Sequence, residues 1–114
     1  MAEGHSGYEP TSVDIDDYIT INSGFTVNQK YAYWVAPNLV FICLDLGGTF
    51  DEGQTVIGTA TNKVFNQAYI PGRVTATGWK SKPATGVIIS GGQVRVHTDV
   101  AGIAAVLCGF IIVH

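Results

Sequence analysis

Two stretches of the chain are apolar at almost every position. Residues 39–46 lie between Pro37-Asn38 and Gly47-Gly48, and Asp45 is the one polar residue among them. Residues 104–113 form a second such run. Short apolar runs bounded by strong breakers are typical of β-strands. A strand with one face in water alternates apolar and polar residues, so both faces of these two predicted strands need cover.

The rest of the chain shows short alternating segments divided by turn residues. We expect further strands at residues 18–21, 25–27, 30–35, 55–59, 73–79, 85–90 and 93–98, with a long loop at 61–72. The clearest hairpin joins residues 85–90 to 93–98 through Ser90-Gly91-Gly92. Seven to nine short strands without a helical period predict an all-β fold, an antiparallel β-sandwich similar to a jelly roll.

Two arrangements would cover the two apolar strands. In the first, both strands lie in the middle of the sandwich core. In the second, they approach the symmetry axis of a cyclic oligomer, which we expect to be a homotrimer. In that case Ile42 or Ile111 is the expected residue at the axis.

The first 17 residues differ from the rest of the chain. Residues 1–17 are polar and carry Asp14, Asp16 and Asp17, which predicts an extended N-terminal arm followed by one domain at residues 18–114. The start of the chain has neither the basic nor the apolar region of a signal peptide. The apolar run at 100–113 is shorter than the roughly 20 residues of a membrane-spanning helix, so we expect no membrane insertion.

Composition supports self-association and disfavours nucleic acid as a partner. The 114 residues are 46% hydrophobic and 13% charged, about half of the usual ~25% charged share. A net charge of −3 does not suit a polyanion such as nucleic acid. Low charge combined with a high apolar content favours a surface that is buried by another copy of the chain.

Residues with catalytic or metal-binding chemistry are sparse. The three histidines are scattered without metal-ligand spacing, and Asp14, Asp16 and Asp17 lack the glycine and the distal glutamate of a calcium loop. We therefore predict no enzyme, no metal and no cofactor.

The two cysteines lie one on each apolar strand. Cys43 and Cys108 are either buried free thiols or, if the strands are neighbours, a disulfide.

Several side chains suit the binding of a saccharide. The rings of Trp79 and Tyr69 offer flat faces for stacking on the C–H side of a sugar. Arg95 and His97 share the outward face of their strand, opposite Val94 and Val96, so both can donate to sugar hydroxyls. Asp99 joins the same row if the strand continues far enough. Trp79 precedes a predicted turn at residues 80–83, and both a core and a surface position are open for it.

A set of short motifs resembles a known family. The motifs are Asn22-Ser23-Gly24-Phe25, residues 38–42, Gly48-Thr49-Phe50 to Gly53, Val56-Ile57-Gly58-Thr59, Ala76-Thr77-Gly78-Trp79 and the hairpin at residues 85–96. Together they resemble the C-terminal head domains of receptor-binding and minor tail or fibre proteins of tailed phages. The resemblance covers about residues 21–113, and its motifs specify the fold much better than the ligand.

The resemblance implies a trimeric β-sandwich displayed on a virion, and many members of the family bind host-surface saccharides. We therefore expect a phage virion protein, a trimeric fibre or receptor-binding head whose N-terminal arm contacts other virion proteins. Two alternatives stay open. One is a capsid decoration or head-fibre subunit without a ligand, and the other is a bacterial carbohydrate-binding lectin.

Overall fold

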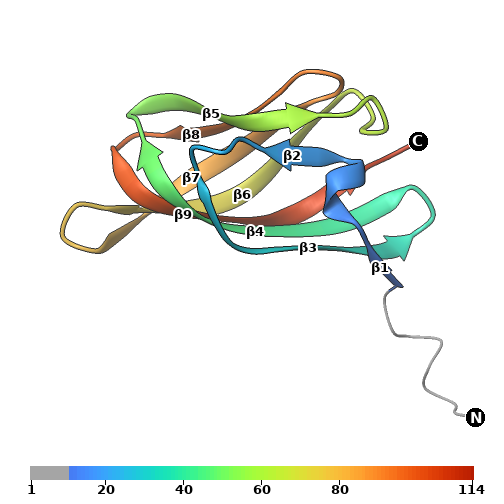
Figure 1. The fold of residues 1–114 in the computed structure, drawn as a ribbon, viewed down its shortest axis with the longest axis horizontal. Coiled ribbons are helices and arrows are strands. Elements are labelled where there is room, and N and C mark those ends of the chain that lie inside the picture. The colour runs from blue at the N-terminus through green and yellow to red at the C-terminus, as the bar shows by residue number, and fades with distance from the viewer. Residues whose placement is uncertain (1–10) are drawn as a thin grey trace, which may run out of the picture.

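The computed structural model describes residues 11–114 as nine antiparallel strands and one 3-10 turn (Figure 1). In chain order these are β1 (Thr11–Val13), η2 (Ile15–Asp17), β2 (Ile19–Ile21), β3 (Thr26–Ala36), β4 (Leu39–Phe50), β5 (Gly53–Ala60), β6 (Gln67–Ala76), β7 (Lys80–Ile89), β8 (Gln93–Thr98) and β9 (Gly102–Ile112). The predicted all-β, antiparallel class is confirmed.

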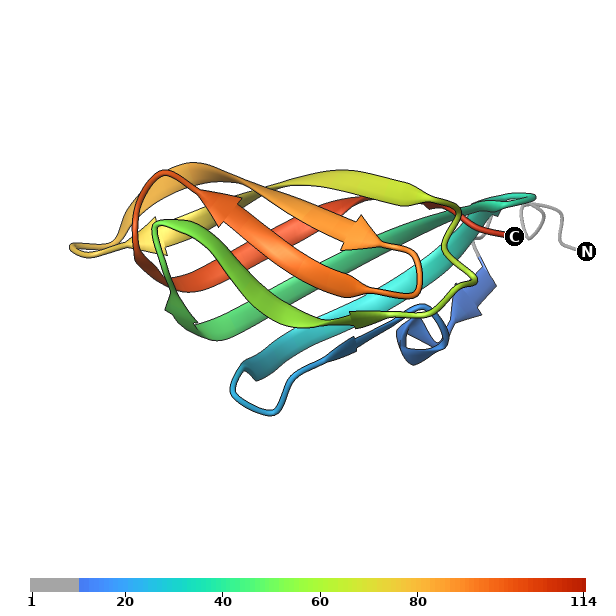
Figure 2. The same cartoon turned by 90° about the horizontal axis from the view of Figure 1, so that it is seen from above.

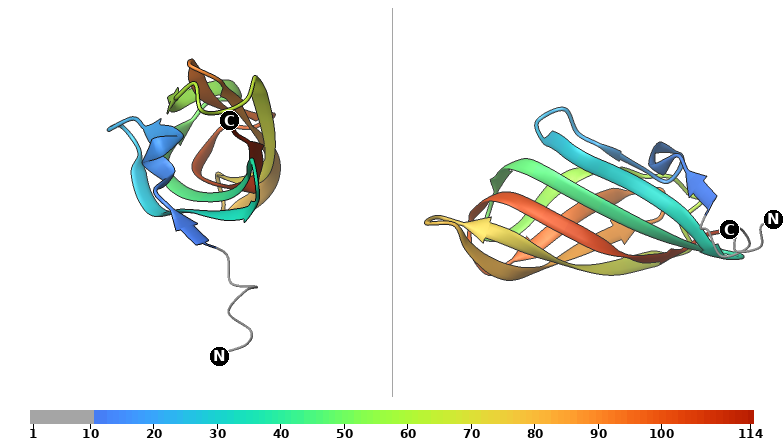
Figure 3. Two further views of the ribbon diagram at one scale, coloured as in Figure 1. Left: turned by 90° about the vertical axis from the view of Figure 1, so that its right-hand side faces the viewer. Right: turned by 90° about the horizontal axis from the view of Figure 1, so that it is seen from below.

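The strands form one continuous sheet in the order β1-β3-β4-β9-β6-β7-β8-β5-β2. This sheet curls into a half-barrel, which Figure 3 shows along its length and from below. The sandwich that the sequence predicted would instead have two separate sheets. The difference has a physical reason: strands of 10–12 residues twist and coil, so the far side of the same sheet covers the inner apolar face.

The two apolar strands, β4 and β9, are direct neighbours over almost their whole length. Their inward side chains alternate with outward ones, and Val40, Leu44 and Leu107 are fully buried in the interior. Ile42 and Ile111 also point inward and are buried, so the expectation that either faces a symmetry axis is wrong. The outward positions belong to their chain neighbours, because side chains change face at every residue of a strand.

The two cysteines occupy directly opposed positions on β4 and β9 and form a disulfide. Of the two expectations for Cys43 and Cys108, free thiols are therefore wrong and the bridge is present. The bridge lies on the outward side, since each cysteine is flanked in its strand by buried inward residues.

Glycines allow the curled sheet to pack its interior densely. A Cβ at Gly72 would lie 2.4 Å from the side chain of Leu107, and one at Gly86 would lie 2.7 Å from that of Ile70. Because a real side chain at either position would displace these neighbours, the large residues on β6 and β9 fill the space that the glycines leave.

Residues 11–17 close the half-barrel at one end. β1 pairs with β3 at one edge of the sheet and β2 pairs with β5 at the other, so the short η2 turn spans the gap between the two edges. Figure 2 shows β2 running between β5 and β3. Ile15, in η2, is only 4% exposed and packs into the core. The predicted arm at residues 1–17 thus overlaps the folded unit from Thr11 onward, while residues 1–10 lie outside the described residues.

Aromatic side chains complete this closure. The rings of Tyr18 and Trp34 meet edge to face with centroids 6.4 Å apart. Burial raises the pKa of the Tyr18 hydroxyl above its ordinary value, and the carboxylate of Asp17 adds to the shift. The contact between the rings of Tyr18 and Trp34 joins the chain after η2 to β3.

Several strands are longer than the sequence predicts. β6 starts at Gln67 within the predicted long loop, and β7 starts at Lys80 within the predicted turn. The predicted break at Asn28-Gln29 is a bulge inside β3. In each case pairing with a neighbouring strand satisfies the backbone hydrogen bonds of residues whose own strand preference is weak.

Removing the buried side chain of the closing segment should destabilise the fold. We expect Ile15→Ala to lower the free energy of unfolding by about 2–5 kcal/mol, because it leaves a cavity where the segment meets the core. Urea denaturation measures this, with Ser12→Ala as the control on exposed β1. An Ile15→Ala midpoint equal to that of the wild type would show that this segment lies outside the cooperative unit.

Candidate functional site

The outward side of the central strands carries a continuous apolar surface, which we call the outer face. It consists of the outward side chains of β3, β4, β9 and β6. Its large members are Tyr31, Tyr33, Leu39, Phe41, Tyr69, Pro71, Val106, Phe110 and Ile112. Phe110 is 56% exposed and Ile112 is 55% exposed. Isolated apolar residues are ordinary on protein surfaces, but a contiguous group across four strands makes the outer face the candidate site of interaction.

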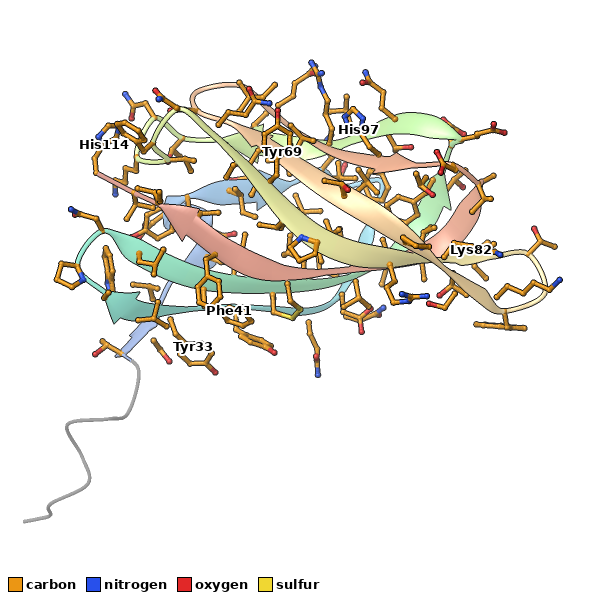
Figure 4. All side chains as sticks on the ribbon, turned by 180° about the vertical axis from the view of Figure 1, so that it is seen from behind. Tyr33, Phe41, Tyr69, Lys82, His97 and His114 are labelled. Carbon is orange, nitrogen blue, oxygen red and sulfur yellow. A yellow bond between two sulfur atoms is a disulfide. The ribbon has the colours of Figure 1, made fainter. Side chains whose placement is uncertain are left out.

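Contacts across the strands order the outer face. The rings of Phe41 and Phe110 lie opposite each other on β4 and β9 with centroids 5.2 Å apart. The rings of Tyr31 and Tyr33 lie 5.4 Å apart on β3. Figure 4 shows Tyr33 and Phe41 projecting from the same side of the sheet. Together with the disulfide between β4 and β9, these pairs hold the outer face in one arrangement.

Two hollows lie on the outer face. One, of about 570 Å³, is lined by Pro71, Gly72, Arg73, Val106 and Cys108, together with Thr75 and Ser81. The outward residues Pro71, Val106 and Cys108 around this hollow are small or medium in size, while Gly72 takes an inward position opposite Leu107.

The second hollow, of about 350 Å³, lies between the start of β6 and the end of β9. Tyr69, Phe65, Phe110 and Ile112 contribute its aromatic and aliphatic walls. Tyr69 thus lies on the border of the outer face.

The structure brings three of the predicted saccharide residues to one side of the sheet. Tyr69 on β6 pairs with Val87 on β7, and Val87 pairs with Arg95 on β8. His97 follows two residues later on the same outward side of β8. Tyr69 is 65% exposed, and Figure 4 shows Tyr69 and His97 on the same side of the half-barrel. Strand spacing puts the backbones of Tyr69 and Arg95 about 10 Å apart, a span that suits one sugar unit.

The polar groups of this row differ in their contacts. The Nε of Arg95 donates to the side-chain oxygen of Gln93 at 3.1 Å. The Nε2 of His97 is buried and has no hydrogen-bond partner among the described residues. His97 and Asp99 line a depression of about 330 Å³ beside Thr85. Asp99 itself follows the last residue of β8, so it lies at the end of the row and not within the strand.

Trp79 lies apart from the other predicted residues. It occupies the tip of the β6–β7 hairpin, where Ala76 pairs with Lys80, and it is 80% exposed. Of the two positions that the sequence left open, Trp79 therefore has the surface one. Seven residues of β6 separate Ala76 from Tyr69, which corresponds to roughly 20 Å or more. Trp79 and Tyr69 cannot contact the same sugar ring.

The outer face is the feature that inspection of single residues missed. The sequence pointed to two strands with apolar faces on both sides, but selected Ile42 and Ile111 as the residues to be covered. Asp45 supplied the missing signal, because the one polar residue of the apolar run 39–46 identifies the side that points outward. Phe41, four residues before Asp45, shares that side.

Other chemistry is limited in the described part of the chain. Within residues 11–114, no group of three or more His, Cys, Asp or Glu side chains is placed to hold a metal ion. Over the same range, no helix has the length and apolar character needed to cross a membrane. Of the acidic patch, Asp16 pairs with Lys30 at 3.1 Å, which fastens η2 to β3.

Comparisons of the chain with protein-family models, with curated proteins and with solved structures found no match.

The different settings of the two tryptophans make a direct test of the fold. We expect Trp79→Ala to change the free energy of unfolding by less than about 0.5 kcal/mol, because the ring lies in solvent. Trp34→Ala should cost about 2–4 kcal/mol, because it removes the ring that packs on Tyr18. Thermal and urea denaturation of both variants measure the contrast, and equal losses in the two would contradict the placement of Trp79 at the hairpin tip.

Proposed function

We propose that this chain is a non-enzymatic structural protein of a phage virion, a trimeric fibre or receptor-binding head that adheres to host-surface saccharide. The single observation that carries the proposal is the apolar outer face of β4 and β9. Its exposed aromatic and aliphatic side chains need cover, and a second and third copy of the chain supply it. The resemblance of the sequence motifs to phage head domains supports the same assembly.

The adhesive part of the proposal rests on Tyr69, Arg95 and His97. Tyr69 offers a stacking face, and the terminal N–H groups of the Arg95 guanidinium offer donors to sugar hydroxyls. His97, whose Nε2 is buried, lies beside them on β8. Because Tyr69 also lines a hollow with Phe110 on the outer face, an assembled trimer would place this row beside a boundary between subunits. Attachment to other virion proteins is assigned to the residues that precede β1.

One observation favours a second candidate, a decoration or head-fibre subunit without a ligand. The two aromatic rings that the sequence suggested for stacking, Trp79 and Tyr69, are too far apart to act together. A single stacking ring makes a weaker saccharide site. The same outer face would serve assembly in either case, so binding to glycans distinguishes the two.

Assembly through the outer face predicts the effect of a charge within it. The wild type should be a trimer at micromolar concentration in light scattering coupled to size-exclusion chromatography. Phe110→Glu should be a monomer, because an unpaired charge buried at a subunit contact costs about 3–5 kcal/mol. Trp79→Glu at the hairpin tip is the matched control and should stay trimeric. A wild-type monomer under these conditions would refute the proposed assembly.

Adhesion predicts a separate pattern on a glycan array. Tyr69→Ala should weaken binding to the recognised glycan by roughly tenfold, since a lost stacking face is worth about 1–1.5 kcal/mol. Trp79→Ala, also an exposed aromatic residue, should bind as the wild type does. Loss of binding in Trp79→Ala alone would move the site to the hairpin tip. An array without any binding would leave the subunit without a ligand as the better assignment.

A further inference from the structure

The outer face carries one row of charge, and its two signs lie on opposite sides of β9. Asp45 on β4 pairs with Val106 on β9, and Val106 pairs with Arg73 on β6. All three side chains point outward. Asp45 and Arg73 are the charged residues at outward positions of β3, β4, β9 and β6. The row therefore reads acidic, apolar, basic across roughly 10 Å.

Neither charge is neutralised by another described residue. Asp45 accepts a hydrogen bond from the side-chain amide (Nδ2) of Asn28 at 3.4 Å. The guanidinium of Arg73 donates to the side-chain hydroxyl and to the backbone carbonyl of Ser81. The ion pair between described residues joins Lys30 to Asp16, away from the outer face. Covering the outer face would thus bury two charges that lack a partner of opposite sign within residues 11–114, and this is costly unless the partner comes from the covering chain.

The shape of the outer face differs on its two sides in a complementary way. On the β6 side, Pro71, Gly72 and Val106 line the hollow of about 570 Å³ next to Arg73. On the β3–β4 side, the rings of Tyr31 and Tyr33 form an aromatic ridge, and Tyr31 pairs with Cys43, two residues before Asp45. A ridge with a negative charge and a hollow with a positive charge are what a head-to-tail contact between identical chains requires, because each copy then presents different surfaces to its two neighbours.

We infer that, in the trimer proposed above and resting on that proposal, Asp45 of each copy pairs with Arg73 of the next around an axis parallel to β9. Rotation about such an axis brings the β4 side of one copy against the β6 side of its neighbour, so opposite charges meet at all three contacts. An axis perpendicular to the strands and parallel to the sheet would set Asp45 against Asp45 and is disfavoured. The aromatic ridge of one copy then enters the hollow of the next, with the disulfide and Val106 nearest the axis.

Charge reversal tests the pairing. Asp45→Arg and Arg73→Asp should each raise the dissociation constant of the trimer at least roughly tenfold, because each places like charges at every contact. The double variant D45R/R73D restores opposite charges and should return to within about threefold of the wild type. Asp51→Arg, between β4 and β5, and Lys80→Asp, at the start of β7, are exposed charge reversals outside the outer face and serve as the matched controls. Sedimentation equilibrium measures assembly, and circular dichroism melting confirms that each variant is folded.

A mixture of the two single variants provides a second readout. Asp45→Arg offers two basic groups and Arg73→Asp two acidic ones, so a mixed trimer has opposite charges at two of its three contacts, whereas a trimer of either variant alone has them at none. Mixed trimers should therefore form at concentrations where each variant alone is dissociated, although more weakly than the wild type. A wild-type trimer with unaffected single variants, or with a double variant as weak as the singles, would overturn the Asp45–Arg73 pairing and leave the trimer standing. A monomeric wild type would overturn both.

Discussion

The pairing of β4 with β9 is the constraint on which the rest of this fold depends. Both strands are apolar on two sides, so their inward residues must fill an interior while their outward residues stay available to another surface. Backbone hydrogen bonds and the disulfide fix the register between the strands, and a shift by one residue would exchange the two sets of side chains. One ladder therefore determines both what the core contains and what the outer face presents.

The need to cover the inward side chains of β4 and β9 determines how the sheet curls. The described strands form one sheet without a separate second layer over the inward side of β4 and β9, so the remaining strands curl round to cover it. Small residues such as Gly72 and Gly86 make room for Leu107 and Ile70. The outward side chains are not covered in this way, because no part of residues 11–114 lies over Phe110 or its neighbours. In the proposed assembly, the same two strands would link the stability of one copy to its association with others.

Patterns within a few residues predicted the fold class and the direction of individual side chains, because side chains in a strand alternate between its two faces. The strict alternation at Val94 and Val96 put Arg95 outward, and the residues around Ser90-Gly91-Gly92 formed the expected hairpin. Contacts between distant segments could not be obtained in this way. Ile15 looks like one apolar residue in an acidic stretch until β1 and β2 fix it between two sheet edges. Trp79 lies away from the candidate site because the pairing of β6 with β7 continues to Ala76 and Lys80, further toward the hairpin tip than the turn residues suggest.

The position of β9 in the sheet has a consequence for the order in which the chain can fold. β9 follows both of its neighbours, β4 and β6, in sequence but lies between them in space. During synthesis, the hairpins β3–β4 and β6–β7 can form early, yet each leaves one unpaired edge until β9 inserts and joins them. An interior strand of the sheet, β9, is thus the last of the nine to emerge from the ribosome. A chain that stalls before residue 102 would display two open edges, β4 and β6. The edge of β4 is strongly apolar, which makes incomplete translation products of this protein prone to aggregate.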